Sequence, residues 1–225
     1  MIGTIVNATM VLLASLFGYA IGRKIKEDVR DRIMKVLGLT IIFIGLKMAF
    51  ETKNPVLIIA SVVIGTVIGE MLKIEDGLES FAAKIERKFS GFTFAEGFVT
   101  ATILFCVGPM AVVGSIREGL TGDASIILAK TMLDMVSALF LSAIFGLGVA
   151  LSSLSILAYQ GTITIFAGSV ASYMTEEIIA EVTASGGIIV MAIGFNVVGL
   201  SRFKAANMLP ALIVAPLGVL IYSAL

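Results

Sequence analysis

Apolar residues in this chain are gathered into long runs, and the charged residues fall mainly between them. These runs lie at residues 2–22, 34–50, 55–72, 94–114, 124–150, 154–174, 184–200 and 206–224. A helix that crosses a bilayer needs about 20 apolar residues. The pattern therefore predicts an all-α, polytopic membrane protein with about eight transmembrane helices. Residues 94–114 fit either a full span or a re-entrant segment.

One stretch, residues 77–90, differs from its neighbours. Its apolar residues recur at helical spacing with charges between them, which predicts an amphipathic helix on the membrane surface, with a short soluble helical linker as the alternative. We expect a single integral membrane domain over residues 1–225. Its predicted parts are a first repeat (1–72), a surface helix and linker (73–92), two central spans (93–150) and a second repeat (151–225).

The composition supports a membrane protein and excludes other classes. Of the 225 residues, 58% are apolar and 14% are charged, and the mean hydropathy is +1.07. A soluble globule of this composition could not cover its surface with polar groups. The net charge is zero, without the basic excess of a nucleic-acid-binding protein. The expected partners are therefore the lipid bilayer and a small ion or solute, and not nucleic acid.

The absence of histidine and the single cysteine, Cys106, restrict the chemistry further. Histidine is the commonest general base and metal ligand, and one cysteine forms neither an internal disulfide nor a thiolate cluster. The HExxH motif and the Ser-His-Asp triad are therefore impossible. We expect that the chain is not an enzyme and that it holds no metal or other cofactor, sodium as a handled ion excepted.

Basic residues are divided unevenly between the two ends of the predicted spans. The loops after the first, third and seventh spans carry most of them: Arg23, Lys24, Lys26, Arg30, Arg32, Lys35, Lys73, Lys84, Arg87, Lys88, Arg202 and Lys204. Basic loops face the cytoplasm, which predicts a multi-pass membrane protein with both termini outside. Positive charges follow the first apolar run instead of preceding it, which is unlike a signal peptide.

Short matches relate the first three spans to the last three. They pair Gly3-Thr4-Ile5 with Gly161-Thr162-Ile163, Gly38 and Gly45 with Gly187 and Gly194, and Asn54 and Gly65 with Asn207 and Gly218. A basic loop in the first copy corresponds to an acidic loop in the second. These features predict an inverted three-helix repeat, spans 1–3 and 6–8, as in many secondary transporters. A re-entrant fourth segment would make the repeat parallel instead.

Gly108 and Pro109 interrupt the fourth apolar run. Proline removes a backbone hydrogen bond, and freed carbonyls at membrane depth need partners. A broken central helix of this kind can bind an ion or solute at its half-helix ends, whereas a simple proline kink is the alternative. Gly108, Pro109 and the nearby Ser115 are therefore candidate binding residues.

Lys130 and Asp134 are four residues apart in the fifth apolar run and so share a helix face. A lone charge there costs about 2.5 kcal/mol or more, and an intramembrane carboxylate is a functional candidate. Either the two residues form a neutral pair that only packs, or Asp134 exchanges the lysine for a cation or proton.

Amides within the spans and charged residues near the span ends are further candidates. The amides Asn7, Gln160 and Asn196 lie within apolar runs and either bind the ion or join helices. Arg117 and Asp123 are expected at the outer mouth of the pathway, and Glu118 is expected in a solvated loop.

The central residues resemble a known family. The run from Val107 to Ile116, then Gly119-Leu120, Gly122-Asp123, Lys130 and Leu133-Asp134, is similar to the YqgA/YdfK-like family of bacterial inner-membrane proteins, as are Gly3 to Asn7 and Gln160-Gly161. The likeness covers essentially the whole chain. It implies a domain of unknown function for which a sodium channel or pump has been suggested.

These features together favour transport over other functions. We expect a cation-coupled (Na⁺ or H⁺) alternating-access transporter of an ion or small solute, with Asp134 as its buried cation site. The alternatives are an ion channel formed by a homo-oligomer and a membrane scaffold or regulator that transports nothing. A homo-oligomer is expected because 225 residues are few for a complete pathway.

Overall fold

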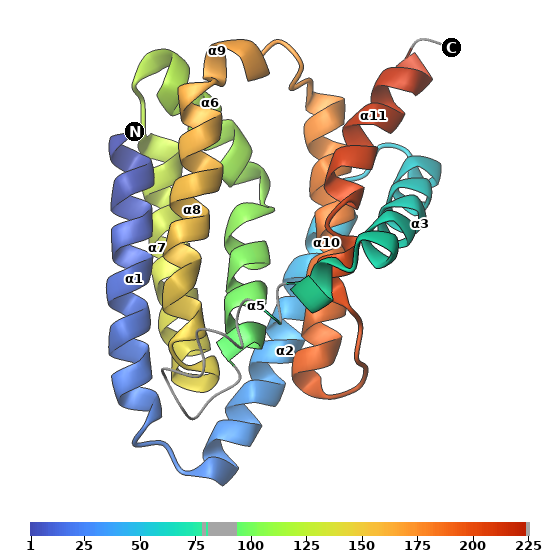
Figure 1. The fold of residues 1–225 in the computed structure, drawn as a ribbon. Coiled ribbons are helices and arrows are strands. Elements are labelled where there is room, and N and C mark those ends of the chain that lie inside the picture. Colours follow the sequence, from blue (N-terminus) through green and yellow to red (C-terminus); the bar gives the residue numbers. More distant parts are fainter. Residues whose placement is uncertain (78–79, 81–93, 224–225) are drawn as a thin grey trace. The chain divides into compact units, whose positions relative to one another are not determined.

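A computed structural model describes residues 1–77, 80 and 94–223, and this part of the chain contains helices and connecting loops but no strand (Figure 1). The elements are α1 (Ile2–Gly22), α2 (Glu27–Ala49), α3 (Pro55–Leu72), α5 (Phe94–Cys106), α6 (Pro109–Thr121), α7 (Ser125–Phe145), α8 (Gly148–Ile165), α9 (Ala167–Val170), α10 (Glu176–Val198), the 3-10 helix η1 (Ala205–Met208) and α11 (Ala211–Ser223). The predicted surface helix at 77–90 lies outside the described residues apart from Gly77 and Ser80.

Helices long and apolar enough to cross a membrane make up most of the described chain. Six segments meet this requirement, and the bent pair of α5 and α6 makes a seventh if it counts as one span. The predicted all-α membrane class is therefore confirmed. The predicted count of eight also includes α2, which does not meet the requirement because charged residues occupy its first turns and Lys47 its last. Helix α3 fits a lipid environment, since large apolar side chains such as Val56, Ile59 and Met71 are exposed on it.

Several predicted boundaries are shifted, and local residues explain the shifts. The run 124–150 is divided between α7 and α8 because Gly146, with φ of 79°, turns the chain after Phe145. Positive φ is readily adopted by glycine alone. Helix α10 begins at Glu176 and not near 184, because the Thr175 side chain accepts a hydrogen bond from the Ile178 N–H and caps the helix.

The described chain divides into two compact units that are interleaved along the sequence. Unit 1 comprises Met1–Ile33 and Ser80–Ser172, and unit 2 comprises Met34–Glu79 and Tyr173–Leu225. The units therefore do not coincide with the sequence segments 1–72 and 151–225. Each unit instead combines two stretches that are far apart in the sequence.

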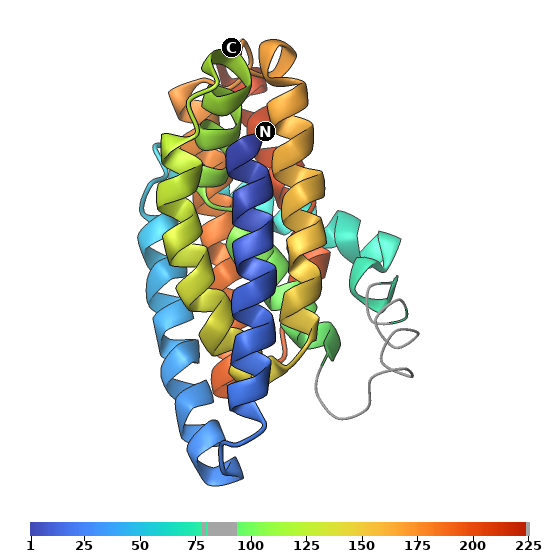
Figure 2. The same cartoon turned by 90° about the vertical axis from the view of Figure 1, so that its left-hand side faces the viewer.

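In unit 1, α1 packs along α7 and α8, as Figure 2 shows. Helices α1 and α7 run parallel: Gly3 contacts Ala124 near the start of α7, and Gly22 contacts Ala143 near its end. The Ser142 hydroxyl, near the end of α7, donates a hydrogen bond of 2.7 Å to the Ser15 carbonyl oxygen on α1. Small residues allow this approach, which is typical of helix pairs in membranes.

Helices α5 and α6 form a broken helix with a bend of 59° between them. Phe94, at the start of α5, lies against Gly148 at the start of α8, and Thr102 donates a hydrogen bond of 3.1 Å to Ser155. Gly119, near the end of α6, lies against Thr164 near the end of α8. The bent pair thus advances along the whole of α8 and does not turn back, which is the geometry of a broken span.

Unit 2 contains two antiparallel helix pairs, and close backbone contacts hold the two helices of each pair together. The first pair is α2 and α10. A Cβ added at Gly38 would meet the Gly194 carbonyl oxygen at 3.1 Å, and one added at Gly45 would meet that of Gly187 at 2.6 Å. The reverse contacts hold as well, at 2.9 Å from Gly194 to Gly38 and 2.5 Å from Gly187 to Gly45. Only glycine permits two helices to cross this closely.

Helices α3 and α11 form the second antiparallel pair. Gly65 lies against Ala211, and Gly218 lies against Leu57. Gly65 and Gly218 are matched to each other in the sequence repeat. The four glycines of the α2–α10 crossing are likewise matched in pairs. The match of Gly3-Thr4-Ile5 with Gly161-Thr162-Ile163 differs, because Gly3 lies at the start of α1 whereas Gly161 lies near the end of α8. That match does not join equivalent positions.

Candidate functional site

A buried ion pair lies in the middle of unit 1. Lys130 and Asp134 on α7 are 5% and 7% exposed, and the Lys130 ammonium contacts the Asp134 Oδ2 atom. The Asn7 Nδ2 atom on α1 donates a hydrogen bond of 3.0 Å to the same oxygen. The parallel packing of α1 on α7 brings Asn7 to this position. The carboxylate therefore has a charged and a neutral partner, while the Asn7 Oδ1 atom has no partner within the described residues.

The break between α5 and α6 lies beside this pair. Phe105, at the end of α5, has its ring centroid 6.0 Å from the Lys130 Nζ atom. The buried thiol of Cys106 follows Phe105 as the last residue of α5. Gly108 and Pro109, two of the predicted site residues, follow directly. Gly108 adopts an extended conformation, with φ of −71° and ψ of 150°, and Pro109 is the first residue of α6, a position where the missing N–H costs nothing.

Further buried polar atoms without a hydrogen-bond partner are found on α6 and α8. They are the Ser115 Oγ, Gln160 Oε1 and Nε2, and Thr164 Oγ1 atoms. Gly119 contacts Thr164, and the two helices run in the same direction. Ser115 and Gln160 each lie one turn before that contact and so at the same level of unit 1. Unpaired buried polar groups are costly, and each calls for an explanation.

A second buried carboxylate, Glu118 on α6, lies close to this group. It is 3% exposed, and its Oε1 atom accepts a hydrogen bond of 2.6 Å from the Gly3 N–H. Its Oε2 atom accepts longer hydrogen bonds from the Thr4 N–H, at 3.4 Å, and the Thr4 hydroxyl, at 3.2 Å. The Met1 α-amino group lies 3.0 Å from Oε1. Glu118 is thus buried against the first turn of α1. The sequence-based expectation of a solvated loop was wrong.

The remaining predicted residues lie elsewhere. Arg117 and Asp123 pair with each other at 2.7 Å at the α6–α7 connection, where both side chains are partly exposed. A hydrogen bond from the Ser125 N–H, with Arg117 nearby, lowers the pKa of the Asp123 carboxyl. Asn196 belongs to unit 2, where both its side-chain atoms bond the Phe203 backbone at 2.7 Å. Its amide holds the loop after α10.

Comparisons with known proteins identify the family of the chain. The sequence model of a family described as "Protein of unknown function (DUF554)" matches residues 2–220. The chain belongs to the DUF554 family. It is 32% identical over 228 residues to the "Uncharacterized membrane protein YdfK" of Bacillus subtilis (strain 168), covering 100% of this chain and 98% of that protein.

A second relative of this DUF554 chain is the "Uncharacterized protein YqgA" of Escherichia coli (strain K12). It is 29% identical over 221 residues, covering 95% of this chain and 94% of that protein. No solved structure matches the chain. The resemblance drawn from the central residues is thereby confirmed, and the name of the Bacillus relative supports membrane association.

The residues gathered in this DUF554 chain suit the binding of a small ion or polar solute. No three histidine, cysteine or acidic side chains converge as a metal site within the described part. What unit 1 offers instead is one carboxylate in an ion pair, a second carboxylate nearby, and neutral amide and hydroxyl oxygens without partners. Oxygen atoms of this kind bind hard cations.

Sequence reasoning did not identify Glu118 or Thr4 as part of this group. In the sequence, Glu118 lies beside Arg117 and before a glycine-rich turn, where a glutamate is usually solvated. Its spacing of three residues from Ser115 was the available signal, since it places both side chains on one face of α6.

Proposed function

We propose that this protein transports an ion or small solute across a membrane by a cation-coupled, alternating-access mechanism in which Asp134 binds the cation. The observation that supports this most directly is the buried Lys130–Asp134 pair, which Asn7 joins beside the broken helix. A charge at membrane depth costs about 2.5–3.5 kcal/mol on insertion scales. A pair that serves only packing could be replaced by apolar residues at little cost.

The pair also provides a mechanism for exchange. Asp134 contacts Lys130 on its own helix, one turn away, and both side chains are almost fully buried. If a cation enters, Asp134 binds it and Lys130 withdraws from the carboxylate. The lysine therefore acts as an internal competitor that keeps Asp134 neutralised between transport steps. The unpartnered oxygens of Asn7, Ser115 and Gln160 are the further ligands in this proposal.

An inverted repeat is part of the proposal, and the contacts within unit 2 support it. Exchange of Gly38 with Gly187 and of Gly45 with Gly194 converts each contact of the α2–α10 crossing into the other. Reciprocal contacts of this kind are expected from a two-fold relation. In the antiparallel pair α3 and α11, the same operation converts the contact of Gly65 with Ala211 into one between Gly218 and Ile58, next to the observed Leu57.

Backbone N–H groups before α3 and before α11 each donate to a glutamate, although the two glutamates are not equivalent in the repeat. The Lys53 and Asn54 N–H groups before α3 donate to Glu181 on α10, at 2.7 and 2.9 Å. The Ala206 N–H before α11 donates to Glu75 at 2.7 Å. Ala206 corresponds to Lys53 when Asn207 is matched with Asn54. Alternating access in transporters with inverted repeats exchanges the conformations of the two copies.

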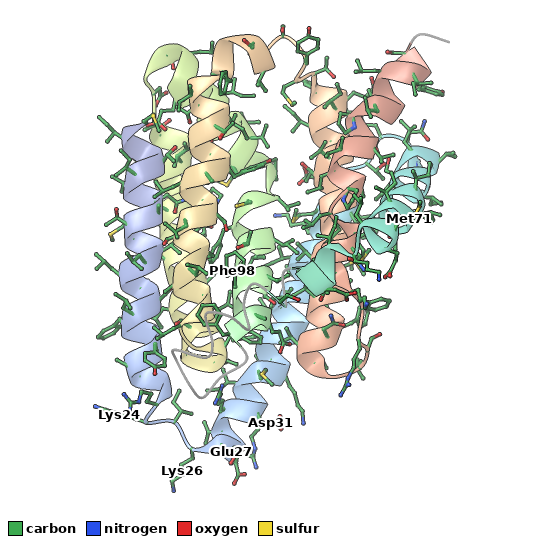
Figure 3. The ribbon with its side chains drawn as sticks, in the orientation of Figure 1. Lys24, Lys26, Glu27, Asp31, Met71 and Phe98 are labelled. Carbon is green, nitrogen blue, oxygen red and sulfur yellow. The ribbon has the colours of Figure 1, made fainter. Side chains whose placement is uncertain are left out.

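Orientation and assembly complete the proposal. Figure 3 shows Lys24 and Lys26 at the connection between α1 and α2, together with Glu27 and Asp31. Basic residues dominate this connection in the sequence, and the positive-inside rule places it in the cytoplasm. We accordingly propose an inner (plasma) membrane location with both termini outside. The proposed assembly is a homo-oligomer, and the proposed activity requires no cofactor and no covalent catalysis.

Flux in proteoliposomes tests the proposal. Purified wild-type protein is subjected to sodium, potassium and proton gradients, and the variant Asp134→Asn is expected to lose the flux. The double variant Lys130→Gln, Asp134→Asn removes both charges, so its loss of flux does not reflect an unpaired lysine. Asp28→Asn, at an exposed aspartate on α2, serves as the matched control. Wild-type flux in folded Asp134→Asn would refute the assigned role, and unsaturable flux would favour the channel.

A further inference from the structure

Two buried carboxylates, Glu118 and Asp134, are connected through one face of α1. Glu118 accepts a hydrogen bond from the Thr4 hydroxyl at 3.2 Å, and Asp134 accepts one from the Asn7 Nδ2 atom at 3.0 Å. Thr4 and Asn7 are three residues apart, which places them on the same face of the helix, one turn from each other. Both are fully buried. A continuous row of polar side chains therefore leads from α6 to the ion pair on α7.

Buried polar atoms without a partner among the described residues occur on α6 and α1, close to the residues that make these contacts. Gly114 on α6 lies against Ile126 and Ile127, and Gly3 lies against Ala124 and Ile127. Helix α6 therefore runs antiparallel to α7 and to α1. On α6, Ser115 lies one turn from Glu118 toward the break. On α1, Asn7 lies one turn from Thr4 in the same direction.

The atoms in question are the Ser115 Oγ and Asn7 Oδ1 atoms, which are buried and unpaired, with Gln160 on α8 at the same level. Such atoms are costly unless something binds them. Their place between two carboxylates points to a positively charged ligand.

Glu118 itself has capacity for a further partner. A carboxylate offers about four lone-pair sites. Its Oε1 atom bonds the Gly3 N–H and the Met1 amine at 2.6 and 3.0 Å. Among the described residues, Oε2 has only the two long contacts with Thr4, at 3.4 and 3.2 Å. Oε2 can therefore receive a cation while Oε1 continues to hold α1.

We propose that Glu118 is a second cation-binding carboxylate, and that Thr4, Ser115 and Asn7 line the route by which the cation passes between Glu118 and Asp134. The ligand is a monovalent cation or a proton, the same species that binds Asp134, so the proposal rests on the proposed function. A purely structural role for Glu118, as a cap of the first turn of α1, makes no use of Ser115. This difference can be tested.

The test compares Glu118→Gln and Ser115→Ala with wild-type protein in proteoliposomes under sodium, potassium and proton gradients. We expect each variant to reduce flux by about tenfold or more, the factor expected from losing one contact to a charged group. Ser115→Ala breaks no hydrogen bond within the described protein, so its thermal stability should equal or exceed that of the wild type. Ser15→Ala is the matched control and should retain full flux, since Ser15 is also a buried serine with an unpaired hydroxyl but lies on α1.

The outcomes separate this proposal from the proposed function. Wild-type flux in Ser115→Ala and Glu118→Gln, with flux lost in Asp134→Asn, would overturn the second site and leave the function of Asp134 intact. Loss of flux in Ser15→Ala as well would attribute the Ser115 effect to packing and overturn the route. Absence of flux in the wild type under every gradient would overturn both proposals. If Glu118→Gln fails to fold, Ser115→Ala alone decides.

Discussion

The Asn7 side chain on α1 donates a hydrogen bond to Asp134 on α7, although the two residues lie in different predicted spans and far apart in the sequence. The same carboxylate oxygen contacts Lys130. Asp134 therefore has one partner that can leave, a flexible lysine, and one that is fixed by the packing of α1. This asymmetry suits the exchange of cations that we propose for Asp134.

Replacing Lys130 by glutamine should make the protein depend on added cation. The variant leaves Asp134 buried without its charged partner, and breaking a buried pair costs about 3–5 kcal/mol. A cation that replaces the lysine should restore the loss. We therefore expect Lys130→Gln to unfold at a lower temperature than the wild type in choline chloride and to recover in the chloride of the transported cation. Equal unfolding temperatures in both salts would contradict the exchange of Lys130 for a cation.

The α2–α10 crossing should not tolerate a single added methyl group. Gly45→Ala would place a Cβ within 2.6 Å of the Gly187 carbonyl oxygen and force the two helices apart. Overpacking of this kind costs about 1–3 kcal/mol. Gly168→Ala on α9 is the control, since an added Cβ there meets nothing within 4 Å. Thermal unfolding in detergent should separate the two variants, and indistinguishable stabilities would disprove the close contact.

Glu181 should protect the start of α3 from solvent exchange. It is fully buried and accepts the Lys53 and Asn54 N–H groups as well as the Thr52 hydroxyl. Glu181→Ala leaves these donors unpaired, at about 1–3 kcal/mol for a buried group. Hydrogen–deuterium exchange at residues 52–56 should become faster by about tenfold or more, since 1.4 kcal/mol is a factor of ten. Glu177→Ala, exposed on the same helix, should leave exchange there unchanged.

The single cysteine of the chain should report whether the region of the break opens. Cys106 is 7% exposed and follows Phe105, whose ring centroid lies 6.0 Å from the Lys130 Nζ atom. A maleimide should label it more slowly than a cysteine introduced at the exposed Ser172 in a Cys106→Ala background. In proteoliposomes, labelling of Cys106 should be faster in the wild type than in the double variant Lys130→Gln, Asp134→Asn. Equal rates would argue against opening at this level during transport.

The sequence predicts the helical membrane class well because the evidence for it is local. A run of apolar residues specifies a span wherever it occurs, and α1, α3 and α11 begin or end close to their predicted limits. Boundaries between adjacent apolar helices are harder to predict, because Gly146 and Gly148 look like any other glycines in an apolar run. The structure separates α7 from α8 there through one positive φ value.

The site is less predictable because it depends on which helices become neighbours. Lys130 and Asp134 are identified from their own spacing, but their contact with Asn7 requires that α1 and α7 run parallel. Glu118 shows the limit most clearly. Nothing in its local sequence states that the first turn of α1 covers it, and only the packing of α6 against α1 turns a loop-like glutamate into a buried carboxylate.

The interleaving of the two units has a consequence for how the protein is made. Helix α2 ends at Ala49, but α10, with which it forms the glycine crossing, begins only at Glu176. At roughly 5–20 residues per second, the ribosome needs roughly ten seconds to bridge this gap. During that interval α2, with its charged first turns, has no crossing partner from its own chain. We expect insertion machinery or chaperones to bind α2 during this interval. A nascent chain halted before α10 should be a preferred substrate for membrane quality-control proteases.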